Sequence, residues 1–188
     1  CSSDLPDWEG LLRCIRREGT PARVHHIELF LDAEVQEAIC QRYDVLGGLD
    51  PTTSDFDLRR QIALQRFLGY DYVRGRLEEM ALPLHRATAD DTAGLQRAGG
   101  RNFMDEHVGP VTTWAEFEAF PWPDPARDEV YAQLEWYERH LPEDMCVIAS
   151  GGFAHFAEHL TWLMGYETLC LSLYDQRDLV RAISDRLV

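Results

Sequence analysis

Side chains suited to acid–base chemistry stand together in the run HHIE at residues 25–28. In an extended chain alternate side chains share a face, so His26 and Glu28 would lie on a face that excludes Ile27. A histidine beside a glutamate near the end of a strand suits proton transfer or the anchoring of a ligand. We therefore take Glu28 and His26 as the candidate catalytic residues. The alternative is that Glu28 pairs structurally with a histidine or an arginine.

Two arginines are the candidates for binding a substrate. Arg74 and Arg76 stand two positions apart in the run YDYVRGRL at residues 70–77, which reads as a strand. Alternation places both guanidinium groups on one face of that strand. We expect them to bind the substrate, and either of them to be a partner of Glu28, because a carboxylate that points into an apolar interior needs a base nearby.

A second candidate for substrate binding is the turn formed by Ser150, Gly151 and Gly152, which follows an apolar run and precedes a predicted helix. Backbone amides at the N-terminus of a helix can hold an anionic group of a substrate. The alternative is a tight turn that merely requires glycine. This turn does not have the G-x-S-x-G spacing of a serine hydrolase, and the chain carries no G-x-G-x-x-G motif.

The spacing H-x-x-E-H occurs at His155, Glu158 and His159. In inverted zinc proteases the two histidines bind zinc and the glutamate activates water. Residues 152–160 look like pitrilysin-type peptidases, a family that takes a third ligand far downstream. The helical spacing predicts a buried apolar stripe made of Phe153, Phe156, Ala157, Leu160 and Met164. We therefore expect the three polar side chains on the opposite, solvated face, without tightly bound zinc.

Helices and strands that would position these residues alternate along the chain. Apolar spacing predicts helices near residues 8–15, 35–43, 55–68, 113–119, 124–141, 153–164 and 179–188, with one further helix before the last. Strands are predicted at residues 24–31, 70–77 and 145–149, and a hairpin at 82–88 and 101–108. Strands alternating with helices indicate the α/β class, and the wholly apolar run at 145–149 indicates a parallel sheet. No closing strand follows the last helix, so the architecture looks truncated.

Composition narrows the classes of function. The chain has 188 residues, the size of one domain, with 33 acidic and 18 basic residues and a formal charge of −15. This charge disfavours nucleic acid and anionic membranes as partners. All basic residues are arginine, which excludes Schiff-base lysines and P-loops. Five scattered cysteines without a CxxC motif favour a reducing, cytoplasmic location over a disulfide framework.

Three stretches resemble the uroporphyrinogen decarboxylase (URO-D) superfamily, including its cobalamin-dependent methyltransferase-like branch. Residues 11–32 are similar to the opening helix, the P-x-R-V entry and the first strand of that family. Residues 109–125 (GPVTTWAEFEAFPWPDP) look like a proline-rich motif of the branch. Residues 163–188 are similar to its L-M-G-x-E segment and the helix that follows. Together, in this order, the three stretches span nearly the whole chain.

The resemblance implies a (β/α)₈ TIM barrel with its site at the C-terminal ends of the strands. A full barrel takes about 250 residues, so the chain would be the N-terminal portion of one URO-D-like domain. The implied activity is methyl transfer onto a small-molecule substrate, with a corrinoid protein as partner. Relatives take zinc from His and Cys residues in the second half of the barrel, so the resemblance implies no metal or other cofactor within residues 1–188.

Three alternative functions remain. The first is uroporphyrinogen decarboxylation in porphyrin biosynthesis, which needs no cofactor; true decarboxylases carry arginines where this chain has residues 25–30. The second is the zinc peptidase indicated by His155, Glu158 and His159. The third is a non-catalytic paralogue that binds a small ligand. A downstream His-x-Cys and a later Cys would favour methyl transfer, whereas their absence would favour the binding module.

Overall fold

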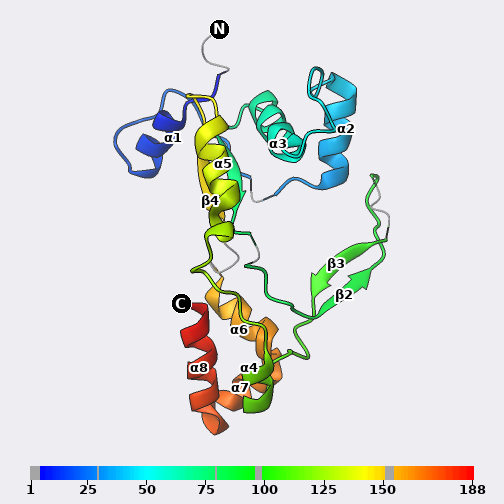
Figure 1. Cartoon of the computed structure of the whole chain (residues 1–188), viewed down its shortest axis with the longest axis vertical. Coiled ribbons are helices and arrows are strands. Elements are labelled where there is room, and N and C mark those ends of the chain that lie inside the picture. Colours follow the sequence, from blue (N-terminus) through cyan, green and yellow to red (C-terminus); the bar gives the residue numbers. More distant parts are fainter. Residues whose placement is uncertain (1–4, 29, 79, 96–98, 151–154) are drawn as a thin grey trace. The chain divides into compact units, whose positions relative to one another are not determined.

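The computed structural model describes residues 5–28, 30–78, 80–95, 99–150 and 155–188. The chain divides into two compact units, each built from two separate stretches of sequence (Figure 1). Unit 1 comprises residues 1–77 and 131–150, and unit 2 comprises residues 78–130 and 151–188. The backbone therefore passes from one unit to the other after residues 77, 130 and 150.

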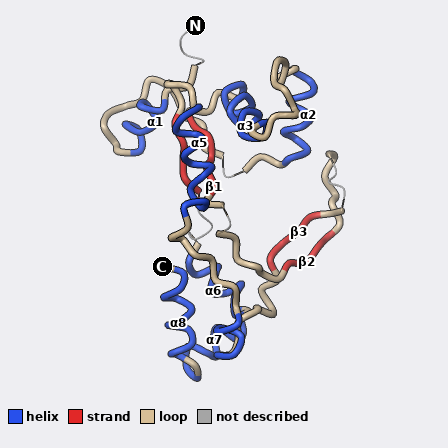
Figure 2. Tube along the Cα trace, viewed as in Figure 1, coloured by secondary structure: helices blue, strands red, loops and turns tan. Residues whose placement is uncertain are grey.

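A parallel strand pair forms the centre of unit 1. Strand β1 (Tyr72–Arg76) pairs with β4 (Cys146–Ser150), with Tyr72 opposite Cys146 and Arg76 opposite Ser150. Helices α3 (Phe56–Phe67) and α5 (Ala132–His140) pack against β1 (Figure 2). Gly75 lets α5 approach closely, because a Cβ atom at this position would overlap the side chain of Leu134. The predicted α/β class and parallel strand pairing are confirmed at this level.

Two hydrophobic clusters cover opposite faces of β1. Tyr72 belongs to a cluster with Leu11 and Tyr70, whereas its neighbour Val73 belongs to a cluster with Tyr137 and Met145. Leu11 comes from helix α1 (Trp8–Ile15), whose N-cap Asp7 accepts a hydrogen bond from the amide of Gly10. Helix α2 (Ala33–Tyr43) completes the elements of unit 1. Because its faces are both covered, β1 can hold side chains of both of its faces in fixed positions.

Unit 2 combines a hairpin with a helical cluster. Strands β2 (Arg86–Ala89) and β3 (Arg101–Met104) pair antiparallel, as predicted. The helices are α4 (Trp114–Ala119), α6 (Phe156–Met164), α7 (Tyr166–Asp175) and α8 (Arg177–Leu187), and a 3-10 helix, η2 (Asp128–Tyr131), lies at the boundary with unit 1. Leu163, Met164, Leu179 and Ile183 are completely buried at the centre of this cluster. Thr113 and Glu116 form a capping box at the start of α4, the helix predicted at residues 113–119.

Two predicted elements differ from the structure. The described residues of the predicted strand at 24–31 form no strand, because side chains of β1, not its backbone, bind this segment. The helix predicted to start after Asp124 begins at Ala132, preceded by η2. No helix among the described residues is both long and apolar enough to cross a membrane.

Candidate functional site

A cavity of about 560 Å³ lies beside β1 within unit 1. Its volume falls in the range of sites for small molecules, roughly 300–1,000 Å³. One wall is β1 with the residues just before it, a second is helix α3, and a third is the start of α5. The segment that contains Glu28, Phe30 and Leu31 forms the remaining wall together with Gln36, and the cavity is open to solvent. Elements distant in sequence thus contribute to one site.

The β1 wall carries an alternating series of side chains. Tyr70, Tyr72, Arg74 and Arg76 all line the cavity, as period-two spacing requires. The hydroxyl of Tyr72 accepts a hydrogen bond from the amide of Glu28 at 3.2 Å, and Arg74 donates to the carbonyl oxygen of Glu28. The backbone of Glu28 is therefore fixed against β1, and its carboxylate makes no hydrogen bond or ion pair within the described ranges.

The helical walls are polar. Asp57, Gln61 and Gln65 stand four residues apart on α3, so they share the face that lines the cavity. On α5, the side-chain oxygen of Gln133 accepts a hydrogen bond from the backbone amide of Arg76 at 2.6 Å. Tyr137, one turn after Gln133, also lines the cavity. The two arginines thus share the cavity with the carboxylate of Asp57, neutral amides and phenols.

Burial raises the pKa of two tyrosines that line the cavity, Tyr70 and Tyr137. It raises the pKa of Tyr137 to about 12, against a smaller opposing effect of Arg76. Burial also raises the pKa of Tyr70, and the nearby carboxylate of Glu28 adds to this increase. Both tyrosines thus remain protonated at neutral pH and can donate hydrogen bonds. The charged side chains that line the cavity are Glu28, Asp57, Arg74 and Arg76.

The structure places some, but not all, of the site residues predicted from the sequence in one cavity. Glu28, Arg74 and Arg76 line the same cavity. Two expectations for Glu28 are wrong: it is exposed, not enclosed in an apolar interior, and within the described residues neither arginine pairs with its carboxylate, since Arg74 binds its backbone carbonyl oxygen. His26 is not among the lining side chains, and its ring lies 6.1 Å from that of Tyr70. Ser150 is the last residue of β4, opposite Arg76, whereas Gly151 and Gly152 lie outside the described residues.

Sequence reasoning missed the contributions of α3 and α5 to the cavity. The four-residue spacing of Asp57, Gln61 and Gln65 was a usable signal, since it places polar side chains along one face of a helix that precedes β1. Gln133 and Tyr137 show the same spacing on α5. No local signal in the sequence indicated that these faces of α3 and α5 would line one cavity beside β1.

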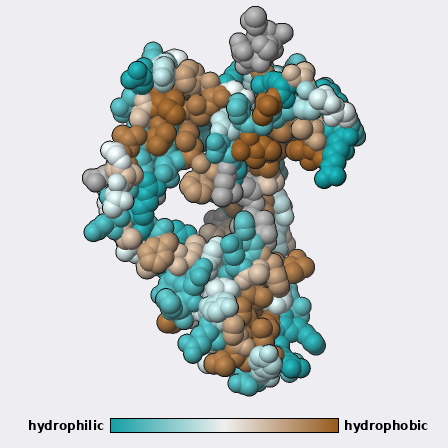
Figure 3. Space-filling model, turned by 180° about the vertical axis from the view of Figure 1, so that it is seen from behind, coloured by the Kyte–Doolittle hydropathy of each residue, from teal (hydrophilic) through white to brown (hydrophobic). Residues whose placement is uncertain are grey.

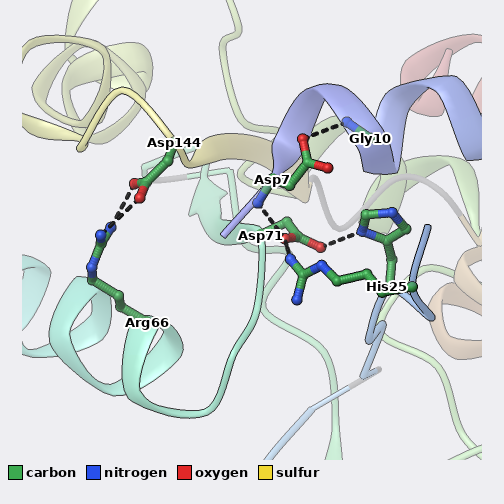
Figure 4. A network of polar contacts seen from close by, with 7 residues as sticks. Asp7, Gly10, His25, Arg66, Asp71 and Asp144 are labelled. Carbon is green, nitrogen blue, oxygen red and sulfur yellow. Dashed lines mark hydrogen bonds and ion pairs between the residues drawn. The ribbon is translucent and has the colours of Figure 1, made fainter. Parts of the chain in front are cut away.

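A buried network holds the segment that leads to Glu28 (Figure 4). Asp71 is completely buried, and its Oδ2 lies 2.7 Å from Nδ1 of His25. Its Oδ1 accepts hydrogen bonds from the amide of Asp7, at 2.6 Å, and from the guanidinium of Arg23. This network fixes residues 23 and 25 beside the start of β1, while Tyr72 and Arg74 fix residue 28. It explains why the segment follows β1 without joining the sheet.

The H-x-x-E-H residues form a different arrangement from the one predicted. His155 pairs with Glu158 at 2.9 Å, and both side chains are more than half exposed. His159 is buried, 7% exposed, so its predicted position on the solvated face is wrong. The predicted apolar stripe is correct at Leu160 and Met164 and wrong at Phe156 and Ala157, which are exposed; Phe153 lies outside the described residues. Its Nδ1 lies 2.9 Å from the carbonyl oxygen of His155, and its ring contacts Trp162. In the described ranges, no group of three or more His, Cys, Asp or Glu residues is placed to hold a metal ion.

Comparisons with known proteins add no identification. No family model, no curated protein and no solved structure matches the chain. The resemblance to the URO-D superfamily therefore remains a prediction from the sequence, and the function has to be argued from the cavity.

Proposed function

We propose that the chain is part of an enzyme of the URO-D superfamily, in its methyltransferase-like branch, and that the cavity beside β1 binds the small-molecule substrate. The observation that carries this proposal is that Glu28, Arg74 and Arg76 line one cavity. Functional side chains of a (β/α)₈ barrel gather at the C-terminal ends of parallel strands, and Arg74 and Arg76 lie in the C-terminal half of the parallel strand β1.

The arginines suit a substrate that carries an anionic group. A guanidinium presents several donors in a plane that matches a carboxylate, and Arg74 uses only part of its donors on the carbonyl oxygen of Glu28. Arg76 makes no side-chain hydrogen bond or ion pair in the part of the chain that the structure describes. The guanidinium group of Arg76 is therefore available to bind a carboxylate of a substrate in the cavity.

The reaction that we propose is methyl transfer involving a corrinoid protein. In this proposal β1 and β4 are strands of a TIM barrel that further residues complete, and zinc is bound by those residues. Glu28 handles a proton of the substrate or anchors it, because its carboxylate has no partner among the described residues and lines the same cavity as the arginines.

The test uses the protein as its gene encodes it. We would measure methyl transfer from methylcobalamin to 3-mercaptopropionate, a thiol whose carboxylate can bind the arginines, by the absorbance of the cobalamin. We expect Glu28→Gln to reduce turnover sharply with an almost unchanged melting temperature, and Arg74→Gln and Arg76→Gln to raise KM. The matched control is Glu37→Gln, an exposed partner of Arg60 that is not a cavity residue.

The outcomes separate the alternatives. Release of carbon dioxide from uroporphyrinogen, without methyl transfer, would replace our proposal with decarboxylation. Binding of 3-mercaptopropionate that depends on Arg76, without turnover, would indicate a non-catalytic paralogue. Unchanged turnover in Glu28→Gln together with a large loss of stability would show that Glu28 has only a structural role.

A further inference from the structure

Among the residues that the structure describes, the positive and negative side chains that line the cavity are equal in number. Two are cationic, Arg74 and Arg76, and two are anionic, Glu28 and Asp57, which gives a formal sum of zero. Carboxylates in the lining repel a ligand that carries only negative charge, whereas a ligand with both charges can pair with groups of each sign. The balance instead matches a ligand whose own charges sum to zero.

The opposite charges lie on different walls. Arg76 is at the end of β1, and Asp57 is in the first turn of α3. Within the described residues, the side chains of Arg76 and Asp57 make no hydrogen bond or ion pair, with each other or with another group. A guanidinium and a carboxylate that face one cavity without pairing leave a gap that a ligand with both charges can span.

The other walls suit the body of such a ligand. The rings of Tyr70 and Tyr72 pack edge to face at 5.8 Å, and both are buried, so they offer a rigid aromatic surface. The amides of Gln61, Gln65 and Gln133 add neutral donors and acceptors. A compact molecule with a separated carboxylate and ammonium, and a short side chain, matches all of these groups.

We infer that the cavity binds a zwitterionic α-amino acid, whose carboxylate contacts Arg76 and whose ammonium contacts Asp57. This inference rests on the proposed function, because it takes the same cavity as the substrate site. It deepens that proposal by naming the class of the substrate. Arg74 donates a hydrogen bond to the backbone carbonyl oxygen of Glu28. The side chains of these two residues provide a second pair of opposite charges beside the same ligand.

The test compares ligands that differ by one charge. The twenty standard amino acids are first screened by thermal shift with the full protein. The best binder is then compared by calorimetry with its deaminated carboxylic acid and its decarboxylated amine. We expect the amino acid to bind at least about tenfold more tightly than either analogue, because each analogue lacks one charged hydrogen bond.

Variants assign the two charges. Asp57→Asn should lower the affinity for the amino acid and tighten binding of its deaminated analogue, because the substitution removes a carboxylate that repels this analogue. Arg76→Gln should lower the affinity for the amino acid to that of its decarboxylated amine. The control variants are Arg60→Gln, whose arginine pairs with Glu37, and Asp128→Asn in η2; neither residue lines the cavity, and both should bind like the unmodified protein.

Each remaining outcome is decisive. No thermal shift with any amino acid would overturn the inference. Equal binding of the amino acid and its deaminated analogue would overturn it as well, while methyl transfer that depends on Arg76 would still support the proposed function. Conversely, binding that requires both charges, without any turnover, would support the zwitterion and contradict the proposed enzyme.

Discussion

Asp71 lies outside the cavity, yet it holds the segment that carries Glu28 in place. Its buried carboxylate binds the amide of Asp7 and the side chains of Arg23 and His25. Removing one member of a buried charged network leaves its partners uncompensated. We expect Asp71→Ala to reduce the free energy of unfolding by about 3 kcal/mol, measured by urea unfolding.

The matched control for this prediction is Asp55→Ala, which removes an ion pair with Arg59 at the surface of the same unit. Its effect should be much smaller, since exposed ion pairs contribute little to stability. A loss as small in Asp71→Ala as in the control would show that the network does not stabilise unit 1.

Asp144 makes the stability of unit 1 depend on pH. Both of its carboxylate oxygens accept hydrogen bonds from Arg66, at 2.5 and 2.7 Å (Figure 4), and these bonds lower the pKa of Asp144 below its ordinary value of 3.8. A lowered pKa in the folded state stabilises the protein above the unfolded pKa, and this contribution is lost as the pH falls through the folded pKa.

Asp144→Asn should therefore be less stable than the unmodified protein at pH 7, and the difference should shrink once the pH falls below about 3.8, the unfolded value. Urea unfolding at a series of pH values measures this difference. A difference that stays constant down to the most acidic pH would contradict the assigned role of the carboxylate.

At the scale of elements, the loop that precedes α4 contacts the end of α6 at a glycine. A Cβ atom at Gly109 would overlap the carbonyl oxygen of Leu163 and the amide nitrogen of Met164, which belong to the backbone of α6. The amide of Val111 donates to the same carbonyl oxygen at 2.8 Å. Gly109→Ala should thus destabilise the protein by about 1–3 kcal/mol or more, as overpacking does.

Thermal unfolding monitored by circular dichroism measures this effect. Gly94→Ala is the control, because a Cβ atom there has no neighbour within 4 Å. A melting temperature of Gly109→Ala equal to that of Gly94→Ala would show that the contact between residue 109 and α6 is not formed.

Elements whose signals are local were predicted well. Helix α1 has a capping aspartate and apolar side chains at helical spacing, and α3 is likewise apparent from the sequence. The strand at 24–31 was predicted wrongly for its described residues, because a strand needs a pairing partner and β-propensity does not reveal whether one is free. Here Tyr72 and Arg74 bind the segment through their side chains.

The candidate site was partly predictable for the same reason. Alternation along one strand placed Arg74 and Arg76 together, whereas the meeting of α3, α5 and β1 depends on contacts distant in sequence. The burial of His159 was missed because Leu163, four residues later, was left out of the apolar stripe. With Leu163 included, the buried face of α6 contains His159.

At the scale of the whole molecule, unpaired strand edges and apolar surface favour self-association. In the described residues β1 and β4 form a sheet of two strands, so each has an outer edge without a ladder partner. Hydrophobic surface is visible on both units (Figure 3). Helix α7 also exposes three large side chains, Tyr166, Leu171 and Tyr174, which are 65%, 59% and 78% exposed.

We expect residues 1–188 expressed alone to be poorly soluble and to associate with increasing concentration, as measured by sedimentation velocity. Replacing Leu171 and Tyr174 by glutamate distinguishes the two causes: association should persist if strand edges cause it and decrease if the apolar face of α7 does. A monodisperse monomer with a sharp cooperative melt would contradict this prediction.

The order of synthesis leaves strand β1 without its partner strand β4 while the chain is still on the ribosome. About 70 residues separate β1 from β4, and they include much of unit 2. At a synthesis rate of about 5–20 residues per second, β1 emerges roughly 4–14 s before its partner strand exists. Tyr72 and Val73, which are almost completely buried in the folded protein, lack that partner throughout this interval. The nascent chain is thus exposed to premature strand pairing with other molecules, and this interval is when a chaperone would protect it.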